Sequence, residues 1–248
     1  MIQNDSHISP SEALSKVPQH VAVIMDGNGR WAKGQGEERL FGHRHGVEAV
    51  REVVRTAAET GVRYLTIYAF STENWGRPTE EVDGIMELIA NAILSELDTL
   101  TRSGIRMEFI GDLASLPQSL QESIRTAQAV RIPDDQLRMT LNVALNYSAR
   151  WELTEATRQI AALVQNGTLA PQDITPDVIS DHLATRGIPD PELLIRTSGE
   201  QRLSNFLLWQ LSYTELYFTD TLWPEFGRDQ MLAALREYGR RERRFGRL

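Results

Sequence analysis

The chain has 248 residues, of which 41% are hydrophobic and 24% charged, a composition typical of a folded α/β domain with a large core. It contains no cysteine, which excludes disulfides, iron–sulfur clusters and thiol catalysis and fits a reducing compartment. The net charge of −8 argues against a general nucleic-acid-binding protein, which needs a broad basic surface.

The predicted elements alternate between strand and helix along the chain. Residues 1–18 are rich in polar residues and Pro and are expected to form a loose arm, followed by one domain over 19–248. Buried strands are predicted over 20–25, 62–70, 105–110, 137–145 and 193–195, with helices over 47–61, 78–104, 115–130, 151–166 and 228–242. This alternation predicts a single α/β domain with a central parallel sheet flanked by helices, whose ligands bind beyond the carboxyl ends of the strands.

The first candidate segment directly follows the first strand. Asp26-Gly-Asn-Gly-Arg30 has two glycines that let backbone N–H groups turn towards an anion, and Arg30 adds a charged donor. Arg39 and His43 follow, and His43 is placed where the next helix begins. Asp26 is a carboxylate within an anion site, which is consistent with Mg²⁺ bridging it to phosphate oxygens. A plain surface turn is the alternative.

The second candidate segment follows the second strand. Ser71, Asn74 and Arg77 are polar groups suited to a substrate, and Trp75 beside a glycine suits a mobile lid. The two glutamates at 80–81 are explained as carboxylates in the first turn of a helix. Such a helix start does not account for the asparagine and the tryptophan, which therefore favour a binding loop.

Two further segments carry charge close to apolar residues. Arg196 comes just past a strand, and Arg202 and Ser204 follow on a loop with a glycine, so that they can hold a second diphosphate without metal. A surface network of arginines and glutamates is the alternative. Glu215 is a lone acid among apolar residues and needs a partner, either a metal shared with Asp26 or an arginine.

Together these segments resemble the undecaprenyl diphosphate synthase family of cis-prenyltransferases. The matching stretches are His20–Ala32, Gly42-His43, Ser71–Val82, Leu194–Gln210, Leu222–Pro224 and Arg243–Gly246, so the resemblance covers nearly the whole chain. It implies a magnesium-dependent, homodimeric enzyme with a deep hydrophobic tunnel. The implied reaction condenses isopentenyl diphosphate onto an allylic diphosphate such as farnesyl diphosphate. The product is a long-chain polyprenyl diphosphate such as undecaprenyl diphosphate, the lipid carrier precursor of cell-wall synthesis.

The resemblance also implies roles for individual residues. Asp26 and Glu215 match magnesium ligands, and Asp26 and Asn74 are the expected catalytic residues, with Asn74 as a proton acceptor. The expected substrate-binding residues are Gly27, Asn28, Gly29, Arg30, Trp31, Arg39, His43, Ser71, Thr72, Glu73, Trp75, Arg77, Arg196, Arg202, Leu203 and Ser204. Those in the first segment, with Arg39 and His43, are assigned to the allylic diphosphate, and those from Arg196 onwards to isopentenyl diphosphate.

Other expectations concern length control, the partner subunit and location. Met139 matches the family position where a large residue closes the tunnel floor, and Arg244-Phe-Gly246 looks like the family's Arg-x-Gly end, which reaches the partner's site. No apolar run approaches the roughly 18 residues of a membrane span, and residues 1–20 lack the order of a signal peptide, so we expect a cytoplasmic protein with at most peripheral membrane contact.

Several alternatives stay open. Asparagine is a poor base, so a phosphate oxygen or Asp26 can replace Asn74 as proton acceptor. The family usually has Gly-Gly-Arg where this chain has Ser148-Ala149-Arg150, which puts the local backbone in doubt. A non-catalytic partner subunit would lack the metal carboxylate and the loop residues, which are present here. The motifs do not exclude a short-chain or irregular prenyl diphosphate synthase.

Overall fold

The computed structural model describes Leu14 and residues 16–242, so most of the expected arm and the Arg244–Gly246 end lie outside the described residues. Six parallel strands form one sheet in the order β3-β4-β2-β1-β5-β6. Their bounds are β1 His20–Ile24, β2 Tyr64–Ser71, β3 Ile105–Ile110, β4 Met139–Tyr147, β5 Leu193–Arg196 and β6 Glu215–Phe218. The predicted α/β domain with a central parallel sheet is thereby confirmed.

Seven α-helices connect or flank the strands in the described part of the chain. They are α1 Asn28–Gly34, α2 Arg39–Thr60, α3 Thr79–Arg102, α4 Gln118–Ala129, α5 Ala149–Gln165, α6 Pro176–Ser180 and α7 Arg228–Arg240, and a 3₁₀ turn spans Thr72–Gly76. The helix predicted over 47–61 begins earlier than expected, so His43 lies in its second turn and the placement of His43 at a helix start was wrong. The short elements α1, α6 and β6 were not predicted.

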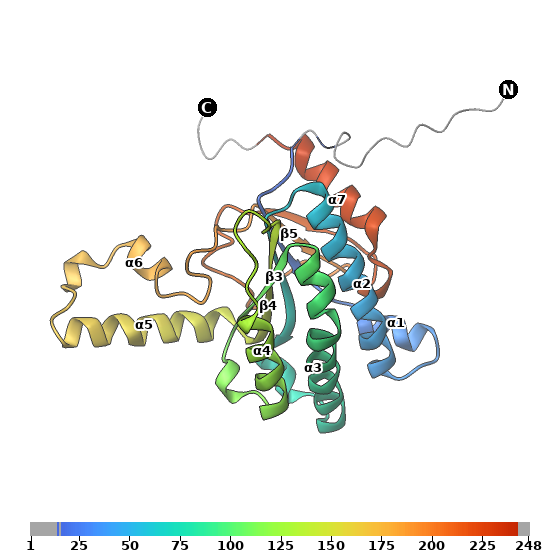
Figure 1. Ribbon diagram of the computed structural model, residues 1–248, viewed down its shortest axis with the longest axis horizontal. Helices are drawn as coiled ribbons and strands as arrows, with labels where there is room; N and C mark the ends of the chain where they lie inside the picture. Colours follow the sequence, from blue (N-terminus) through green and yellow to red (C-terminus); the bar gives the residue numbers. More distant parts are fainter. Residues whose placement is uncertain (1–13, 15, 243–248) are drawn as a thin grey trace.

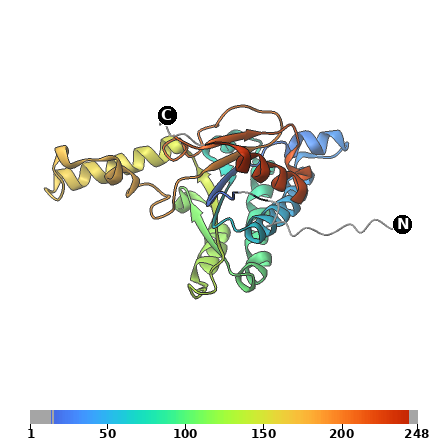
Figure 2. The ribbon, with the colours of Figure 1, turned by 90° about the horizontal axis from the view of Figure 1, so that it is seen from above.

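The helices divide the structure into layers. Residues of α2, α3, α4 and α7 pack on one face of the sheet in the larger core cluster, which includes Val53 and Leu235. Phe206, Leu207 and Leu211 cover part of the other face. Figures 1 and 2 show α2, α3 and α4 lying beside the sheet, whereas α5 and α6 extend away from the body.

The inner strands are buried on both faces, and most of their side chains are apolar. All residues of β1 and β4 are buried, as expected for central strands of a parallel sheet covered on both sides. The buried His20 has partners on both ring nitrogens, at 2.6 Å from the Pro189 carbonyl and 2.7 Å from the Thr66 hydroxyl.

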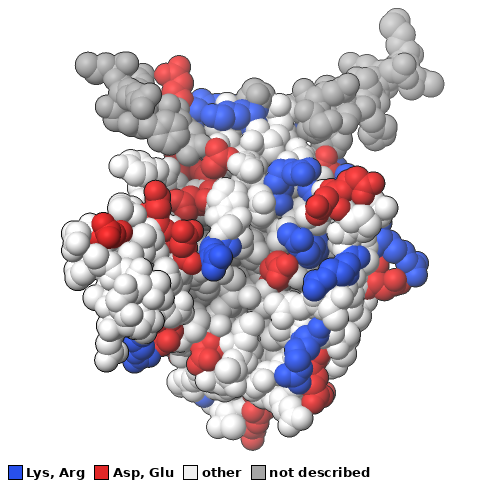
Figure 3. All heavy atoms as spheres, turned by 60° about the vertical axis from the view of Figure 1, so that its left-hand side comes forward, with Lys and Arg blue, Asp and Glu red and all other residues white. Residues whose placement is uncertain are grey.

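The molecular surface is charged without being uniformly basic. On the face shown in Figure 3, acidic and basic side chains both occur. No helix among the described residues is both long and apolar enough to cross a membrane.

The strand order places a crevice between β1 and β5. The chain leaves β1 towards β2 on one side and leaves β5 towards β6 on the other, so their loops diverge at the carboxyl edge. In such sheets, ligands bind where neighbouring connections part in this way. Ile24 at the end of β1 is in register with Arg196 at the end of β5. Asp26 and Arg196 therefore meet at the edge where a ligand is expected.

Candidate active site

Asp26 lies at the centre of the carboxyl edge. Its backbone is fixed by Thr197, whose hydroxyl donates to the Asp26 carbonyl at 2.6 Å and lies 2.9 Å from the Asp26 N–H. Its carboxylate accepts a 3.0 Å hydrogen bond from Arg196 Nη2, and Arg30 Nη2 lies 3.6 Å away. The Asp26 side chain is 33% exposed, whereas that of Arg196 is 3% exposed. The carboxylate thus keeps one side open to a ligand.

Arg196 connects this carboxylate with the loop that follows β5. Its Nη1 donates to the Ser204 hydroxyl at 2.7 Å and to the backbone carbonyl of Arg202. The side chain of Arg202 points into a more exposed region and pairs with Glu200. Glu200 also lies 3.4 Å from Arg30 and thereby links the loops after β1 and β5.

A second charged cluster joins α2 with the start of α3. Glu81 accepts from Arg39 Nε at 2.9 Å and from Arg77 Nη1 at 3.1 Å, and His43 Nε2 lies 3.5 Å from the same carboxylate. Burial alone would raise the pKa of Glu81, but the hydrogen bond and charge of Arg39, together with Arg77, hold it below its usual value. Burial, reinforced by the nearby charge of Arg77, lowers the pKa of His43 to about 4, against the opposing effect of Glu81. His43 is therefore neutral at pH 7.

The glycines of the first segment allow these groups to approach. Gly27 has φ +110°, a left-handed conformation, and an added Cβ would lie 3.0 Å from Leu222. A Cβ on Gly29 would lie 2.6 Å from Arg39 Nη1, so the guanidinium packs directly over the backbone of this turn. The two glycines thus hold the turn after β1 close to the arginine of α2.

The turn after β2 is held by its own side chains. The amide oxygen of Asn74 accepts from the backbone N–H of Ser71 at 3.0 Å, which closes a capping box over residues 72–76. Trp75 donates its indole N–H to Asn146 Oδ1 at 2.8 Å and is 42% exposed. The amide of Asn205 donates to Glu73 at 2.8 Å. The turn therefore contacts the ends of β4 and the loop after β5.

A large cavity opens at these residues and continues between the sheet and helices α2 and α3. Its volume is about 970 Å³, near the upper end of the roughly 300–1,000 Å³ usual for small-molecule sites. Charged and polar groups line one end, including Asp26, Arg39 and Arg196. Apolar residues line the walls, including Val54, Ile89, Leu100, Ile105 and Leu141. The cavity thus joins an anion-binding mouth to an apolar interior.

Comparison with known proteins agrees with this geometry. Residues 24–246 match the family described as "Putative undecaprenyl diphosphate synthase". The chain belongs to the undecaprenyl diphosphate synthase family.

Relatives in this family align over almost the whole chain. The "Isoprenyl transferase" of Porphyromonas gingivalis (strain ATCC BAA-308 / W83) is 53% identical over 93% of this chain and 90% of its own. The "Ditrans,polycis-undecaprenyl-diphosphate synthase ((2E,6E)-farnesyl-diphosphate specific)" of Escherichia coli (strain K12) is 47% identical over 96% of each chain. The crystal structure of lavandulyl diphosphate synthase from Lavandula x intermedia in complex with dimethylallyl diphosphate has 39% identity and a TM-score of 0.87, covering 93% of this chain and 98% of that one.

Most residues expected to bind substrate in this undecaprenyl diphosphate synthase family member lie around one mouth. The cavity is lined by Asp26, Gly27, Asn28, Gly29, Arg30, Arg39, His43, Ser71, Glu73, Asn74, Arg77, Arg196 and Ser204. Four expected residues do not line the cavity, although residues within two positions of each in the sequence do: Thr72, Trp75, Arg202 and Leu203.

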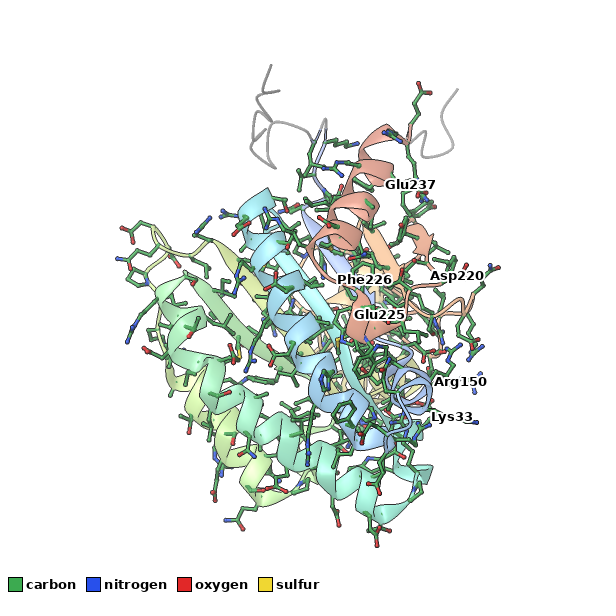
Figure 4. The ribbon with its side chains drawn as sticks, turned by 90° about the vertical axis from the view of Figure 1, so that its right-hand side faces the viewer. Lys33, Arg150, Asp220, Glu225, Phe226 and Glu237 are labelled. Carbon is green, nitrogen blue, oxygen red and sulfur yellow. The ribbon has the colours of Figure 1, made fainter. Side chains whose placement is uncertain are left out.

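Trp31 does not line the cavity either. It stacks on Phe41 at a centroid distance of 5.8 Å and donates its N–H to Glu225 at 3.0 Å. Figure 4 shows Glu225 and Phe226 between α7 and α1, with Lys33 directed outwards from α1. Trp31 thus anchors α1 to the segment before α7.

Glu215 is not brought together with Asp26 within one chain. It begins β6 and pairs in register with Leu193 at the amino end of β5, whereas Asp26 follows the carboxyl end of β1. Its carboxylate accepts from Arg241 at 3.0 Å, which is the arginine partner left open as an alternative. Within one chain, Asp26 and Glu215 therefore stand at opposite ends of the sheet, a separation that depends on the unpredicted strand β6. The assignment of both carboxylates as magnesium ligands stays a prediction.

Several site residues were missed because their segments gave a simpler explanation. Glu81 was attributed to a helix start, although it orders Arg39 and Arg77. Asn146, with φ +48°, takes the left-handed position next to the unusual Ser148-Ala149 pair. Ser148 is extended and caps α5, accepting from Trp151 N at 3.4 Å, so loss of the usual glycines introduces no positive φ at this position.

Proposed function

We propose that this protein is a cis-prenyltransferase that condenses isopentenyl diphosphate with an allylic diphosphate, farnesyl diphosphate, to build undecaprenyl diphosphate. The observation that supports this proposal most is that arginines of two clusters line one end of a single cavity of about 970 Å³ with apolar walls. Two diphosphates need two sets of fixed cationic donors, and a growing hydrocarbon chain needs an apolar space.

The geometry supports separate sites for the two substrates. Arg39, Arg77 and neutral His43 gather around the Glu81 carboxylate beside the turn after β1, and we assign the allylic diphosphate to these donors. Arg196 and the Ser204 hydroxyl form the other, which we assign to isopentenyl diphosphate. The side chains converge on the carboxyl edge, so both diphosphates would sit at the mouth with the chain directed along the cavity, which serves as the tunnel.

These groups suit the charges of the reaction. When the C–O bond to the allylic diphosphate breaks, negative charge builds on the departing oxygens, and preorganised arginines stabilise it. The alkene of isopentenyl diphosphate then attacks the allylic carbon, and a proton is lost from the adjacent carbon. Asn74 lies in the turn beside the mouth, but its amide oxygen already accepts from Ser71, which favours a phosphate oxygen or Asp26 as the acceptor.

The site fits a magnesium ion whose ligands come mostly from the phosphates of the substrate. Among the residues that the structure describes, no three carboxylates or histidines gather into a preformed metal cage. Mg²⁺ is commonly held by one or two carboxylates together with substrate phosphates, and Asp26 supplies one partly exposed carboxylate at the mouth. Bound there, the ion would neutralise charge on the departing diphosphate.

In a homodimer, Glu215 could reach the metal site of the partner subunit. β6 is an edge strand of the sheet, and its Leu216 and the preceding Tyr213 are exposed large hydrophobic side chains. Pairing of two such edges would make the proposed homodimer and would bring Glu215 near a neighbouring subunit. In this arrangement Glu215 would serve the partner's metal rather than its own.

A shorter-chain product remains the second candidate, because a lavandulyl diphosphate synthase superposes with a TM-score of 0.87. The deep apolar interior, with Leu100 and Ile105 at its far end, favours the long product. The test is incubation with labelled isopentenyl diphosphate, Mg²⁺ and either farnesyl or dimethylallyl diphosphate, followed by chromatography. A ladder ending near eleven isoprene units from farnesyl diphosphate supports the proposal, and products of one condensation from either primer refute it.

A further inference from the structure

Two asparagines in left-handed conformation hold the turn after β2 against the rest of the site. Asn146 has φ +48° and accepts from the indole N–H of Trp75 at 2.8 Å. Asn205 has φ +60° and donates to Glu73 Oε1 at 2.8 Å. Asparagine adopts this backbone region more readily than most residues, so neither position requires unusual strain.

Two further groups of Asn205 fix its orientation. Its Oδ1 accepts from the backbone N–H of Arg150 at 3.0 Å, and its carbonyl accepts from Ala149 N at 2.7 Å. Because Oδ1 must face an N–H donor, the Nδ2 group must face Glu73. One side chain thus ties three segments together: the loop after β5, the start of α5 and the turn after β2.

The neighbour of Asn205 belongs to the arginine cluster. Ser204 accepts from Arg196 at 2.7 Å, and Arg196 in turn reaches Asp26 at 3.0 Å. A diphosphate held by Arg196 and Ser204 would therefore contact the loop whose Asn205 hydrogen-bonds to Glu73. Glu73 lies one residue before Asn74, whose placement depends on the turn.

We propose that Asn205 is a positioning residue that couples seating of the isopentenyl diphosphate to closure of the turn over residues 72–76. The coupling rests on the proposed function, because it assigns that diphosphate to Arg196 and Ser204. The latch itself, the hydrogen bond from Asn205 to Glu73, is a property of the free protein. The two parts are therefore separable by experiment.

The test uses Asn205→Asp, Glu73→Gln and the double variant. Asn205→Asp keeps the acceptor for Arg150 but places a carboxylate against Glu73. Amide hydrogen exchange of residues 72–76 should become roughly tenfold faster in the substrate-free protein, because a charged hydrogen bond is replaced by repulsion. The double variant restores a donor across the contact, since the new amide faces the new carboxylate, and should return exchange to near the wild-type rate.

Kinetics test the coupling. In Asn205→Asp the KM for isopentenyl diphosphate should rise roughly tenfold, with a much smaller change for the allylic diphosphate, and the double variant should recover most of the loss. Asn166→Asp is the matched control, because Asn166 lies at the far end of α5. Unchanged exchange in Asn205→Asp, or no rescue in the double variant, overturns the latch. Faster exchange with an unchanged KM overturns the coupling, whereas absence of turnover in the wild type refutes the proposed function instead.

Discussion

Replacing Asp26 by Asn separates chemistry from stability. The amide keeps the size of the carboxylate and an oxygen that accepts from Arg196, but it removes the charge that would hold Mg²⁺. Loss of metal stabilisation of a leaving diphosphate should cost about 4 kcal/mol of barrier, which corresponds to roughly a thousandfold lower turnover. Binding of farnesyl diphosphate should change little, because the arginines of α2 and the turn after β2 remain.

The stability cost should be much smaller. Arg196 is almost fully buried and loses its charged partner at 3.0 Å, but it retains the Ser204 hydroxyl and a backbone carbonyl as acceptors. The Asp26 side chain is one-third exposed, so solvent screens part of the pair. We expect a loss of about 1–2 kcal/mol, equivalent to a fall in melting temperature of roughly 2–8 °C for a domain of this size. The variant therefore stays folded at assay temperature.

The assay measures incorporation of labelled isopentenyl diphosphate as Mg²⁺ is varied, with calorimetric binding of farnesyl diphosphate in parallel. Asp98→Asn is the control, because Asp98 pairs with Arg102 on the solvent side of α3, where both side chains are more than two-thirds exposed. It should leave turnover and binding unchanged. An Asp26→Asn enzyme that reaches within about tenfold of wild-type turnover at saturating Mg²⁺ would refute the role assigned to this carboxylate.

Three further perturbations follow from the same geometry. Arg202→Ala should raise the KM for isopentenyl diphosphate about tenfold without changing the melting temperature, because this side chain is exposed; an equal rise for the allylic substrate would contradict the assignment of sites. Met139→Ala should lengthen the products seen by chromatography, because Met139 is buried and pairs in register with Ile105, which lines the far end of the cavity. Val143→Ala, within the cavity wall, should not lengthen them, and identical product ladders for Met139→Ala and wild type would place the floor elsewhere. Burial lowers the pKa of His20 from 6.5 to about 4, so the unfolded chain takes up a proton first and stability falls as the pH drops from about 6.5 to 4. His20→Gln should make that loss shallower in urea unfolding at several pH values, and parallel curves for variant and wild type would disprove it.

The sheet was predictable because its strands are continuous apolar runs. β3 has the predicted bounds, Ile105–Ile110, and β1 and β5 differ from prediction by one residue at one end. β4 begins two residues later than predicted, at Met139, because the apolar alternation starts in the preceding loop. Periodicity identifies buried segments well but gives their ends poorly, since the flanking residues also pack.

Short and exposed elements gave no comparable signal. α1 begins at Asn28 in a stretch whose glycines favour a turn, and its helical form depends on contacts with α2. β6 has four residues at the sheet edge, of which none is fully buried. Because β6 was not predicted, no strand register indicated that Glu215 and Asp26 lie at opposite ends of the sheet within one chain. Glu81 lies in the first turn of α3, as predicted, but its contact with Arg39 depends on the packing of α2 beside α3, which the local pattern does not indicate.

The carboxylates at the mouth explain how the arginines can be fixed before any substrate arrives. Asp26, Glu81 and Glu200 each accept from or lie close to two arginines. All of these arginines except Arg202 line the cavity, where the carboxylates compensate their charge. A diphosphate offers the same arginines more negative charge than one carboxylate does, so it competes for them directly. In the proposed assignment, a diphosphate that pairs with Arg196 would compete with Asp26 for the guanidinium. The Asp26 carboxylate, already one-third exposed, would then be freer to hold Mg²⁺ beside the phosphate oxygens.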